Sequence, residues 1–463
     1  MESPLETSSS PAKPSALILG AGLAGLSAGL ALARRGWAVT LLEREREVGG
    51  LARTVRLGPD MAFDLGGHRF LSRDPSLLRE VEGLLDGEWT EVPRSSRIYL
   101  EGRFFRYPLK PAQAFLSFGP RAALKIGRDY VWGHLRSLGR RRKEETFEEW
   151  ALNRFGRSLY RIFFKPYTEK VWGMEARRLS AQWARERIDL MDLLHALLRA
   201  VFPSRAARPR TYATRFLYPR RGIGRIAERL AQEVEGLGGR ILCQAEVKAL
   251  ERNNGRVTRV LARAGDETMA LTASRVISTI PITEWCKVLL PAPPSSVQGA
   301  ASRLRYRHMI FVYLLLSGQG LTRDTWVYLP DSHLRICRIH EPRNWSAELV
   351  PAGKTSLCAE IFSERDEGLW LEPDPYMVQM VVEELCSLGL LGESRVLDSK
   401  VLRVPFTHPV YSQGFGGDLQ IVEGFVSAEM ANFCLLGRTG AFEYKDMDQV
   451  MADGLRLGER LGP

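Results

Sequence analysis

The chain has 463 residues and a mass of 52.1 kDa, more than one hydrophobic core usually organises, so we expect two closely joined domains. Its six cysteines are scattered and include no Cys-x-x-Cys pair, which argues against a disulfide framework or a zinc site and favours a reducing, cytoplasmic location. The formal net charge of +11 fits three anionic partners, namely nucleic acid, a membrane surface or a small molecule.

The first residues predict neither a leader nor a membrane anchor. Residues 1–14 are rich in Ser and Pro and carry two glutamates and one lysine, so we expect a flexible tail without the basic flank of a signal peptide. Residues 15–33 contain no charged side chain, but their glycines argue against a membrane span. No other segment is a candidate, so we expect no transmembrane segment.

A strand is predicted over 16–19, and it runs into a G-x-G-x-x-G motif and a helical pattern. A second predicted strand ends at Glu43, 23 residues after Gly20. In this arrangement Gly20 and Gly22 let the backbone approach a pyrophosphate, and Gly25 lets the helix pack on the strand. The Glu43 carboxylate would accept hydrogen bonds from ribose hydroxyls. The pattern therefore predicts a dinucleotide-binding α/β fold.

The segment after Glu43 distinguishes the cofactor. Val48–Thr54 resembles the segment that runs along the FAD pyrophosphate and flavin in the amine oxidase and protoporphyrinogen oxidase superfamily, and NAD enzymes of this fold usually lack it. Segments 241–247, 275–281 and 432–440 are similar to that superfamily's returns of the chain to its FAD domain. The resemblance implies FAD as cofactor and a discontinuous, Rossmann-like FAD-binding domain of the glutathione-reductase type, with an inserted α+β substrate domain. It also implies FAD contacts from Gly50, Leu51, Ala52, Arg53 and Val247.

The three returns divide the remaining chain into cofactor pieces and inserted pieces. Amphipathic runs at 147–164 and 181–201 make the first insert read as mostly helical, whereas the second reads as strands with one helix at 375–388. The expected domains are an FAD-binding domain, a helical basic substrate subdomain and a β-rich substrate subdomain, which occupy residues 15–93 with 213–285 and 430–463, residues 94–212, and residues 286–429, respectively.

Most of the positive charge falls in the middle of the chain. Residues 91–230 hold 31 Lys and Arg against 13 Asp and Glu, a difference of +18, which leaves −7 for the rest. The basic run 140–143 is followed at once by two glutamates, and no nucleic-acid-binding motif accompanies it, so we expect no nucleic-acid partner. The distribution favours a basic substrate domain that attracts a small anionic ligand. A peripheral contact with an anionic membrane stays open.

Three segments resemble the UDP-galactopyranose mutases. Lys165–Gly173 is similar to a Tyr-Thr-x-Lys-Gln-Trp signature, Gly437–Asp448 is similar to the closing motif, and Leu65–Phe70 is similar to the loop that places a histidine beside the flavin. Of two mutase arginines four residues apart, Arg187 matches the first, whereas Met191 stands at the second. The resemblance implies catalytic roles for His68, Arg438 and Tyr444, flavin contacts from Gly67, His68, Gly437, Asp446 and Met447, and substrate contacts from Tyr167, Trp172, Arg187, Arg438 and Tyr444, with Tyr411 as a weaker candidate.

The resemblance implies a flavoenzyme that interconverts the pyranose and furanose forms of a sugar nucleotide through a reduced-flavin N5 adduct. Such an enzyme must hold the diphosphate while the glycosidic bond breaks, a task that suits Arg438 and Tyr444. The alternative is an FAD-dependent oxidoreductase, like an amine oxidase, a protoporphyrinogen oxidase or a desaturase, that acts on a small molecule. The structural readings of His68 as a turn histidine and of Tyr167 and Trp172 as core aromatics also stay open.

Overall fold

The computed structural model describes residues 13–58, 61–107, 119, 121, 124–133, 144–187 and 215–461, and for residue 187 it describes the backbone only. Most of the expected tail, residues 1–14, lies outside these residues, as do residues 188–212 of the expected helical subdomain. Among the helices that are described, none is both long enough and apolar enough to cross a membrane.

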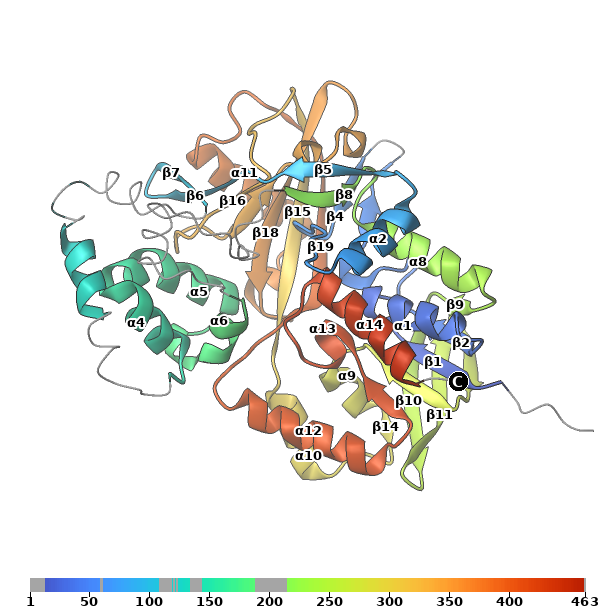
Figure 1. Cartoon of the computed structure of the whole chain (residues 1–463). Coiled ribbons are helices and arrows are strands. Elements are labelled where there is room, and N and C mark those ends of the chain that lie inside the picture. The colour runs from blue at the N-terminus through green and yellow to red at the C-terminus, as the bar shows by residue number, and fades with distance from the viewer. Residues whose placement is uncertain are drawn as a thin grey trace, which may run out of the picture.

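A parallel sheet forms the first half of the molecule, which we call the parallel-sheet half (Figure 1). Its strand order is β20-β13-β1-β2-β9, and all neighbours run parallel. Helix α1 (Leu23–Ala33) is buried all round because α8 (Gly224–Gly236) and α14 (Met447–Leu461) pack against it in addition to the sheet. The strands are β1 (Ser15–Leu19), β2 (Ala38–Leu42), β9 (Arg240–Leu242), β13 (Arg275–Ser278) and β20 (Phe433–Leu435).

Three of these strands come from the segments predicted to return the chain to its cofactor domain. β9, β13 and β20 lie far apart in the sequence, yet they join β1 and β2 in one sheet. A right-handed strand, helix and strand at the start of the chain therefore provides the centre, and later segments extend it on both sides. The expected α/β, Rossmann-like fold class is confirmed.

A four-stranded sheet, ordered β12-β11-β10-β14, completes this half. Helices α10 (Ser295–Arg303) and α12 (Phe415–Glu429) pack on each other and share a hydrophobic core with Leu17 and Leu19 of β1. The expected boundary between residues 285 and 286 is wrong, because β14 and α10 pack with this half. The strands of the sheet are β10 (Ala245–Asn253), β11 (Arg256–Ala264), β12 (Glu267–Leu271) and β14 (Leu289–Leu290).

A seven-stranded sheet, ordered β19-β15-β18-β17-β16-β6-β7, forms the other half, which we call the long-sheet half. Its strand β15 (Tyr306–Ser317) is buried almost throughout because alternate side chains enter two cores. Ile310 and Val312 enter the core shared with α11 (Asp374–Ser387), and Phe311 and Tyr313 enter the core on the opposite face. The other strands are β16 (Trp326–Tyr328), β17 (Arg338–His340), β18 (Lys354–Ser363) and β19 (Val396–Pro409).

The expected helical character of residues 94–212 is wrong near its start. β6 (Ser96–Leu100) and β7 (Arg103–Arg106) form a hairpin at the edge of the seven-stranded sheet, where β6 runs parallel to β16. Ser96 pairs with Trp326, so the partner that makes this segment a strand lies far away in the chain. Short strands depend strongly on such tertiary partners.

The helices of residues 144–187 form a separate lobe (Figure 1). Helix α4 (Phe147–Leu159) begins at a capping box formed by Thr146 and Glu149. The predicted single helix over 147–164 is interrupted at Gly156, whose φ is +72° and where a Cβ would lie 2.3 Å from the Asp129 carbonyl oxygen. A π-helical turn and two short helices follow at Tyr160–Phe164, α5 (Lys165–Trp172) and α6 (Ala181–Arg187).

Two small sheets connect the halves. β3 (Thr54–Arg56) pairs with β4 (Ala62–Asp64), and β5 (Trp89–Pro93) pairs with β8 (Arg215–Pro219). These pairings bring the loop after β4 to the junction of the two halves. The remaining helices and helical turns include Gly50–Ala52, α2 (Pro75–Leu85), Ala176–Arg178, α9 (Ile282–Lys287), Pro342–Asn344, Ala347–Leu349, Gly368–Trp370 and α13 (Gly437–Gly440).

Candidate functional site

One cavity of about 2160 Å³ extends along the junction of the two halves and the helical lobe. It exceeds the roughly 300–1,000 Å³ that one drug-sized ligand needs, so it has room for a dinucleotide and a second molecule. It contains most of the residues singled out in the sequence. Those that line it are Gly20, Gly22, Glu43, Gly50, Leu51, Ala52, Arg53, Gly67, His68, Tyr167, Trp172, Val247, Tyr411, Gly437, Arg438, Tyr444, Asp446 and Met447.

The glycine motif forms a tight turn between β1 and α1. Gly20 has φ +103°, and a Cβ there would lie 2.3 Å from the Thr279 hydroxyl oxygen. Gly22 caps α1 in an extended conformation and lines the cavity, and the first turn of the helix has no acidic residue. Gly25 does not line the cavity: its Cβ would lie 2.1 Å from the Gly20 carbonyl oxygen, so it permits close packing, as predicted. The helix N-terminus is therefore open to an anion.

Glu43 follows β2 at the same end of the cavity. The side chain is buried, and its two oxygens accept hydrogen bonds from the backbone N–H groups of Ala21 at 2.9 Å and Glu45 at 3.0 Å. These bonds orient the carboxylate and leave lone pairs toward the lumen, because each oxygen can accept two bonds. Val247 of β10 lines the same cavity. The geometry suits a carboxylate that accepts hydrogen bonds from ribose.

The loop that carries His68 is held from below by Asp64. This buried carboxylate accepts hydrogen bonds from the Thr54 hydroxyl at 2.6 Å, the Tyr218 hydroxyl at 2.5 Å and the Ile223 N–H at 3.0 Å. Burial raises the pKa of Asp64, while these hydrogen bonds lower it. Asp64 thus joins β4 to β8 and the start of α8, and it anchors the loop's first residue.

Glu360 of β18 holds the same loop from the long-sheet half. Its side chain is fully buried and accepts hydrogen bonds from the Gly67 N–H at 3.0 Å and from Arg338 Nε and Nη2 at 2.9 and 2.5 Å. Burial by itself raises the pKa of Glu360, but the Arg338 charge and the His340 ring lower it to about 2. The carboxylate is therefore ionised at neutral pH and fixes Gly67 beside the cavity.

His68 is neutral at neutral pH. Burial and the nearby Arg438 charge lower its pKa to about 4, although Glu360 opposes them. A hydrogen bond to the backbone of Leu65 also acts on the ring. The imidazole can thus exchange hydrogen bonds with a ligand without adding a positive charge.

Arg438 lies on α13, between β20 and α14. Its guanidinium lies 4.1 Å from the Tyr444 ring centroid, and Nη1 is 3.3 Å from the Lys445 carbonyl oxygen. Its Nε and Nη2 atoms are buried and have no hydrogen-bond partner among the described residues. An arginine held in this way retains two donors for an anion, since a buried charge without partners is costly.

Aromatic side chains from the helical lobe surround this arginine. The Trp172 ring is 5.8 Å from Tyr444 and 5.2 Å from Trp183, and both indoles line the cavity. Both indole N–H groups are buried and lack an acceptor within the described part of the chain. The Tyr411 hydroxyl accepts a hydrogen bond from the Tyr444 N–H at 2.9 Å, so Tyr411 positions the Tyr444 loop. Four donors from Arg438, Trp172 and Trp183 are thus available to a ligand.

Helix α5 is fastened to the long-sheet half by Lys170. Its Nζ donates hydrogen bonds to the carbonyl oxygens of Leu329, Asp331 and Ile336 at 2.6–3.0 Å. This places Tyr167 with its ring 5.8 Å from Tyr328 at the cavity wall. The predicted site residue Arg187 ends α6, but its side chain lies outside the described residues, as does Met191.

Sequence reasoning missed several residues that build the site. Arg338, Glu360, Asp64, Trp183 and Lys170 were not singled out, although four of them are charged residues within otherwise apolar or aromatic segments, which was the available signal. Their roles depend on contacts between distant segments, such as the bond from Gly67 to Glu360 across 293 residues. Among the described residues, no group of His, Cys, Asp and Glu side chains could hold a metal ion.

Residues 23–411 match the sequence model of a protein family described as flavin containing amine oxidoreductase. A curated protein of Klebsiella pneumoniae, "Probable UDP-galactopyranose mutase", is 26% identical over 181 residues, which cover 36% of this chain and 42% of that protein. A 3-hydroxybenzoate 6-hydroxylase of Polaromonas naphthalenivorans is 44% identical over 62 residues, covering 13% and 16% of the two chains. The matched segments span less than half the length of these curated relatives.

Solved structures share the fold over nearly the whole chain. The crystal structure of reduced UDP-galactopyranose mutase matches with a TM-score of 0.81 at 20% identity, covering 97% of this chain and 94% of that one. A protein from Exiguobacterium sp. 255-15 described as a protoporphyrinogen oxidase matches with a TM-score of 0.74 at 17% identity, covering 97% and 98%. A putrescine oxidase bound to putrescine matches with a TM-score of 0.63 at 16% identity, covering 97% and 99%.

Proposed function

The chain belongs to the family of flavin-containing amine oxidoreductases, and from this premise we propose that it is an FAD-dependent mutase that interconverts the pyranose and furanose forms of a sugar nucleotide. The observation that carries the proposal is the group of unpartnered donors on Arg438, Trp172 and Trp183. A diphosphate beside a sugar needs such a site, with a guanidinium for the phosphate oxygens and aromatic faces for the sugar.

FAD is the cofactor of this family, and the residues at one end of the cavity fit it. The turn at Gly20 and Gly22 leaves no room for a side chain on Gly20 and opens the N-terminus of α1 to a pyrophosphate. Glu43 is oriented toward the ribose position by two backbone N–H groups. The segment Gly50–Arg53 and Met447 at the start of α14 line the continuation of the cavity, where the flavin would lie.

The chemistry supplied by bound, reduced FAD is a nucleophile for the anomeric carbon. Arg438 would bind the diphosphate and stabilise its charge as the glycosidic bond breaks. Tyr444 supports the guanidinium from below through its ring. His68, neutral because of burial and the Arg438 charge, would orient a hydroxyl without competing for the anion.

An FAD-dependent oxidase is the second candidate, because one wall of the cavity is apolar. Phe406, Phe415, Leu419 and Phe442 line it, and such a surface suits a hydrophobic amine, alcohol or polycyclic substrate. An oxidase consumes one electron acceptor for each turnover, whereas a mutase needs a reductant once and then shows no net redox change.

The experiment that tests the proposal uses the FAD-loaded protein, reduced with dithionite without oxygen and incubated with a panel of sugar nucleotides. Chromatography should show conversion of one of them to a ring isomer, with the reduced flavin spectrum unchanged after many turnovers. Reconstitution with 5-deaza-FAD, which lacks the flavin N5, should abolish conversion. No isomer from any sugar nucleotide, together with stoichiometric acceptor consumption on an amine or alcohol, would contradict the mutase assignment.

A further inference from the structure

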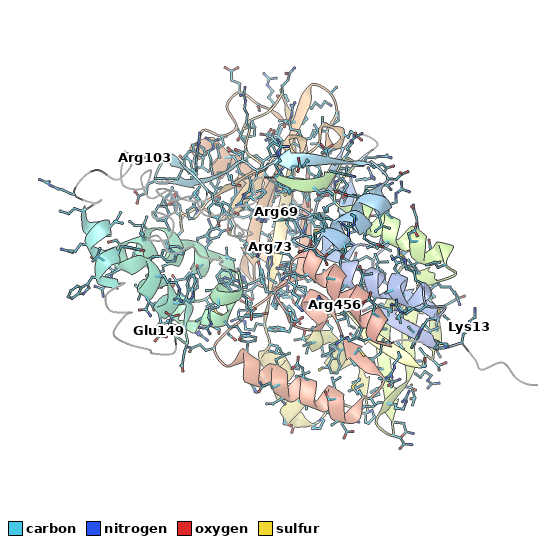
Figure 2. The ribbon with its side chains drawn as sticks, in the orientation of Figure 1. Lys13, Arg69, Arg73, Arg103, Glu149 and Arg456 are labelled. Atoms are coloured by element: carbon cyan, nitrogen blue, oxygen red, sulfur yellow. The ribbon has the colours of Figure 1, made fainter. Side chains whose placement is uncertain are left out.

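A second pair of arginines lines the cavity apart from Arg438. Arg69 follows His68 on the loop after β4, and Arg94 precedes β6. Their guanidinium carbons lie 4.9 and 5.3 Å from the ring centroid of one tryptophan, Trp326. Arg94 also lies 5.2 Å from the Tyr107 ring. In the view of Figure 2, Arg69 and the neighbouring Arg73 lie at the centre of the molecule, where the two halves meet.

The platform beneath these arginines is rigid. Trp326 is buried, and its ring packs against Phe216 at 6.2 Å and Trp345 at 6.0 Å. Stacking of this kind holds a guanidinium in a fixed plane while its N–H groups stay free at the edge. The arrangement therefore presents a preformed fork toward the lumen, without the entropy cost of ordering a flexible side chain on binding.

The charge of Arg69 is not matched by an ion pair. The two arginines nearest in role have carboxylate partners, since Arg97 pairs with Asp324 at 2.5 Å and Arg338 pairs with Glu360 at 2.5 Å. No such pair involves Arg69 among the residues that the structure describes. Burial first, and then the Arg94 charge, lower the pKa of Arg69, and Asp446 opposes this only in part. A bound anion would relieve the repulsion.

We propose that Arg69 and Arg94, held side by side on Trp326, form a second anion-binding subsite, which takes a carboxylate or phosphoryl group of the substrate separate from the diphosphate. The inference rests on the proposed function, in which Arg438 holds the diphosphate, and it narrows the substrate class. The preferred substrate is a sugar nucleotide that carries an additional negative charge, such as a uronate or a phosphorylated sugar. A neutral hexose nucleotide would leave the stacked arginines without a partner.

Calorimetric titration of the FAD-loaded protein with UDP-galactose and UDP-galacturonate tests the subsite. We expect the uronate to bind at least about tenfold more tightly, because charge-assisted hydrogen bonds are stronger than neutral ones. Arg69→Gln should remove that preference while the affinity for UDP-galactose changes less than about threefold. Arg69→Lys, which keeps the charge but loses the planar fork, should retain only part of it. Arg79→Gln removes the same charge from the exposed face of α2 and should change neither affinity.

A second titration separates the two sources of the anion. With UDP present at saturation, acetate and inorganic phosphate are added in turn as the carboxylate and phosphoryl probes, and one of them should bind the wild type and not Arg69→Gln. Equal weakening of both sugar nucleotides by Arg69→Gln would place Arg69 in the diphosphate site and overturn the proposal. So would unchanged affinities for both.

The proposed function and the subsite can fail separately. If neither sugar nucleotide nor UDP binds the wild type, the sugar-nucleotide assignment fails, and phosphate or acetate binding to wild type but not to Arg69→Gln would still support the subsite. If UDP binds and depends on Arg438 but no probe depends on Arg69, the subsite fails alone. Thermal unfolding and the flavin spectrum of each variant establish that it is folded and loaded.

Discussion

Replacement of Glu360 by Gln should destabilise the protein strongly at neutral pH. The carboxylate is fully buried between Arg338 and the Gly67 N–H, and the amide would remove its charge while leaving Arg338 buried. Breaking a buried pair in this way costs about 3–5 kcal/mol. The pKa gives a similar figure: a shift from 4.5 to about 2 corresponds to roughly 3 kcal/mol of stability.

The pH dependence has a definite sign. Because the folded-state pKa of Glu360 is lower than the unfolded value of 4.5, its contribution is fully present above pH 4.5 and is lost as the pH falls toward 2. Chemical unfolding of wild type and Glu360→Gln should therefore differ by about 3 kcal/mol or more at pH 7. The difference should shrink as the pH is lowered from 5.

A matched control separates burial from pairing. Glu251 also pairs with one arginine through two short hydrogen bonds, to Arg259 Nε and Nη2 at 2.7 and 2.9 Å, but the pair lies on the surface of the β10–β11 hairpin. Glu251→Gln should cause no measurable loss, because surface pairs contribute little. A Glu360→Gln variant as stable as Glu251→Gln at pH 7 would refute the reasoning.

Three further predictions concern single contacts. Arg438→Gln should weaken UDP binding about ten- to hundredfold with FAD content unchanged, as measured by calorimetry, because it removes a charged donor pair; equal affinity would contradict its role. Gly20→Ala should lower FAD retention after gel filtration, since φ is +103° and the added Cβ meets Thr279, whereas Gly36→Ala, a positive-φ glycine in open space, should retain FAD. Lys170→Met should lower the free energy of unfolding by about 2 kcal/mol through loss of three carbonyl contacts, and an unchanged denaturation midpoint would argue against them.

The cofactor end of the cavity could be predicted because its signals are local. The strand, the glycine turn, the helix and Glu43 lie within about thirty residues, and each residue type answers a steric or hydrogen-bonding need of a bound dinucleotide. The structure places Gly20, Gly22 and Glu43 at one end of the cavity. The family match then agrees with the flavin inferred from Val48–Thr54.

The errors arose where long-range packing overrides local pattern. Residues 96–106 are strands only because β16 offers an edge to pair with, and the helix over 147–164 breaks because residues 124–133 cross at Gly156. Residues 289–303 belong with the parallel-sheet half because α10 finds its partner, α12, more than a hundred residues later. None of these partners is visible in the segment itself.

The sequence by itself determined the cofactor class, the Rossmann-like centre and a short set of candidate site residues, because glycines, strand ends and a well-spaced acid are dictated by backbone geometry. Only the tertiary structure decided which charges are paired and which are open to a ligand. Glu360 neutralises Arg338 and holds Gly67, whereas Arg438 and Arg69 keep donors directed to the cavity. Pairing is a property of distances between remote segments, and it determines where an anion can bind.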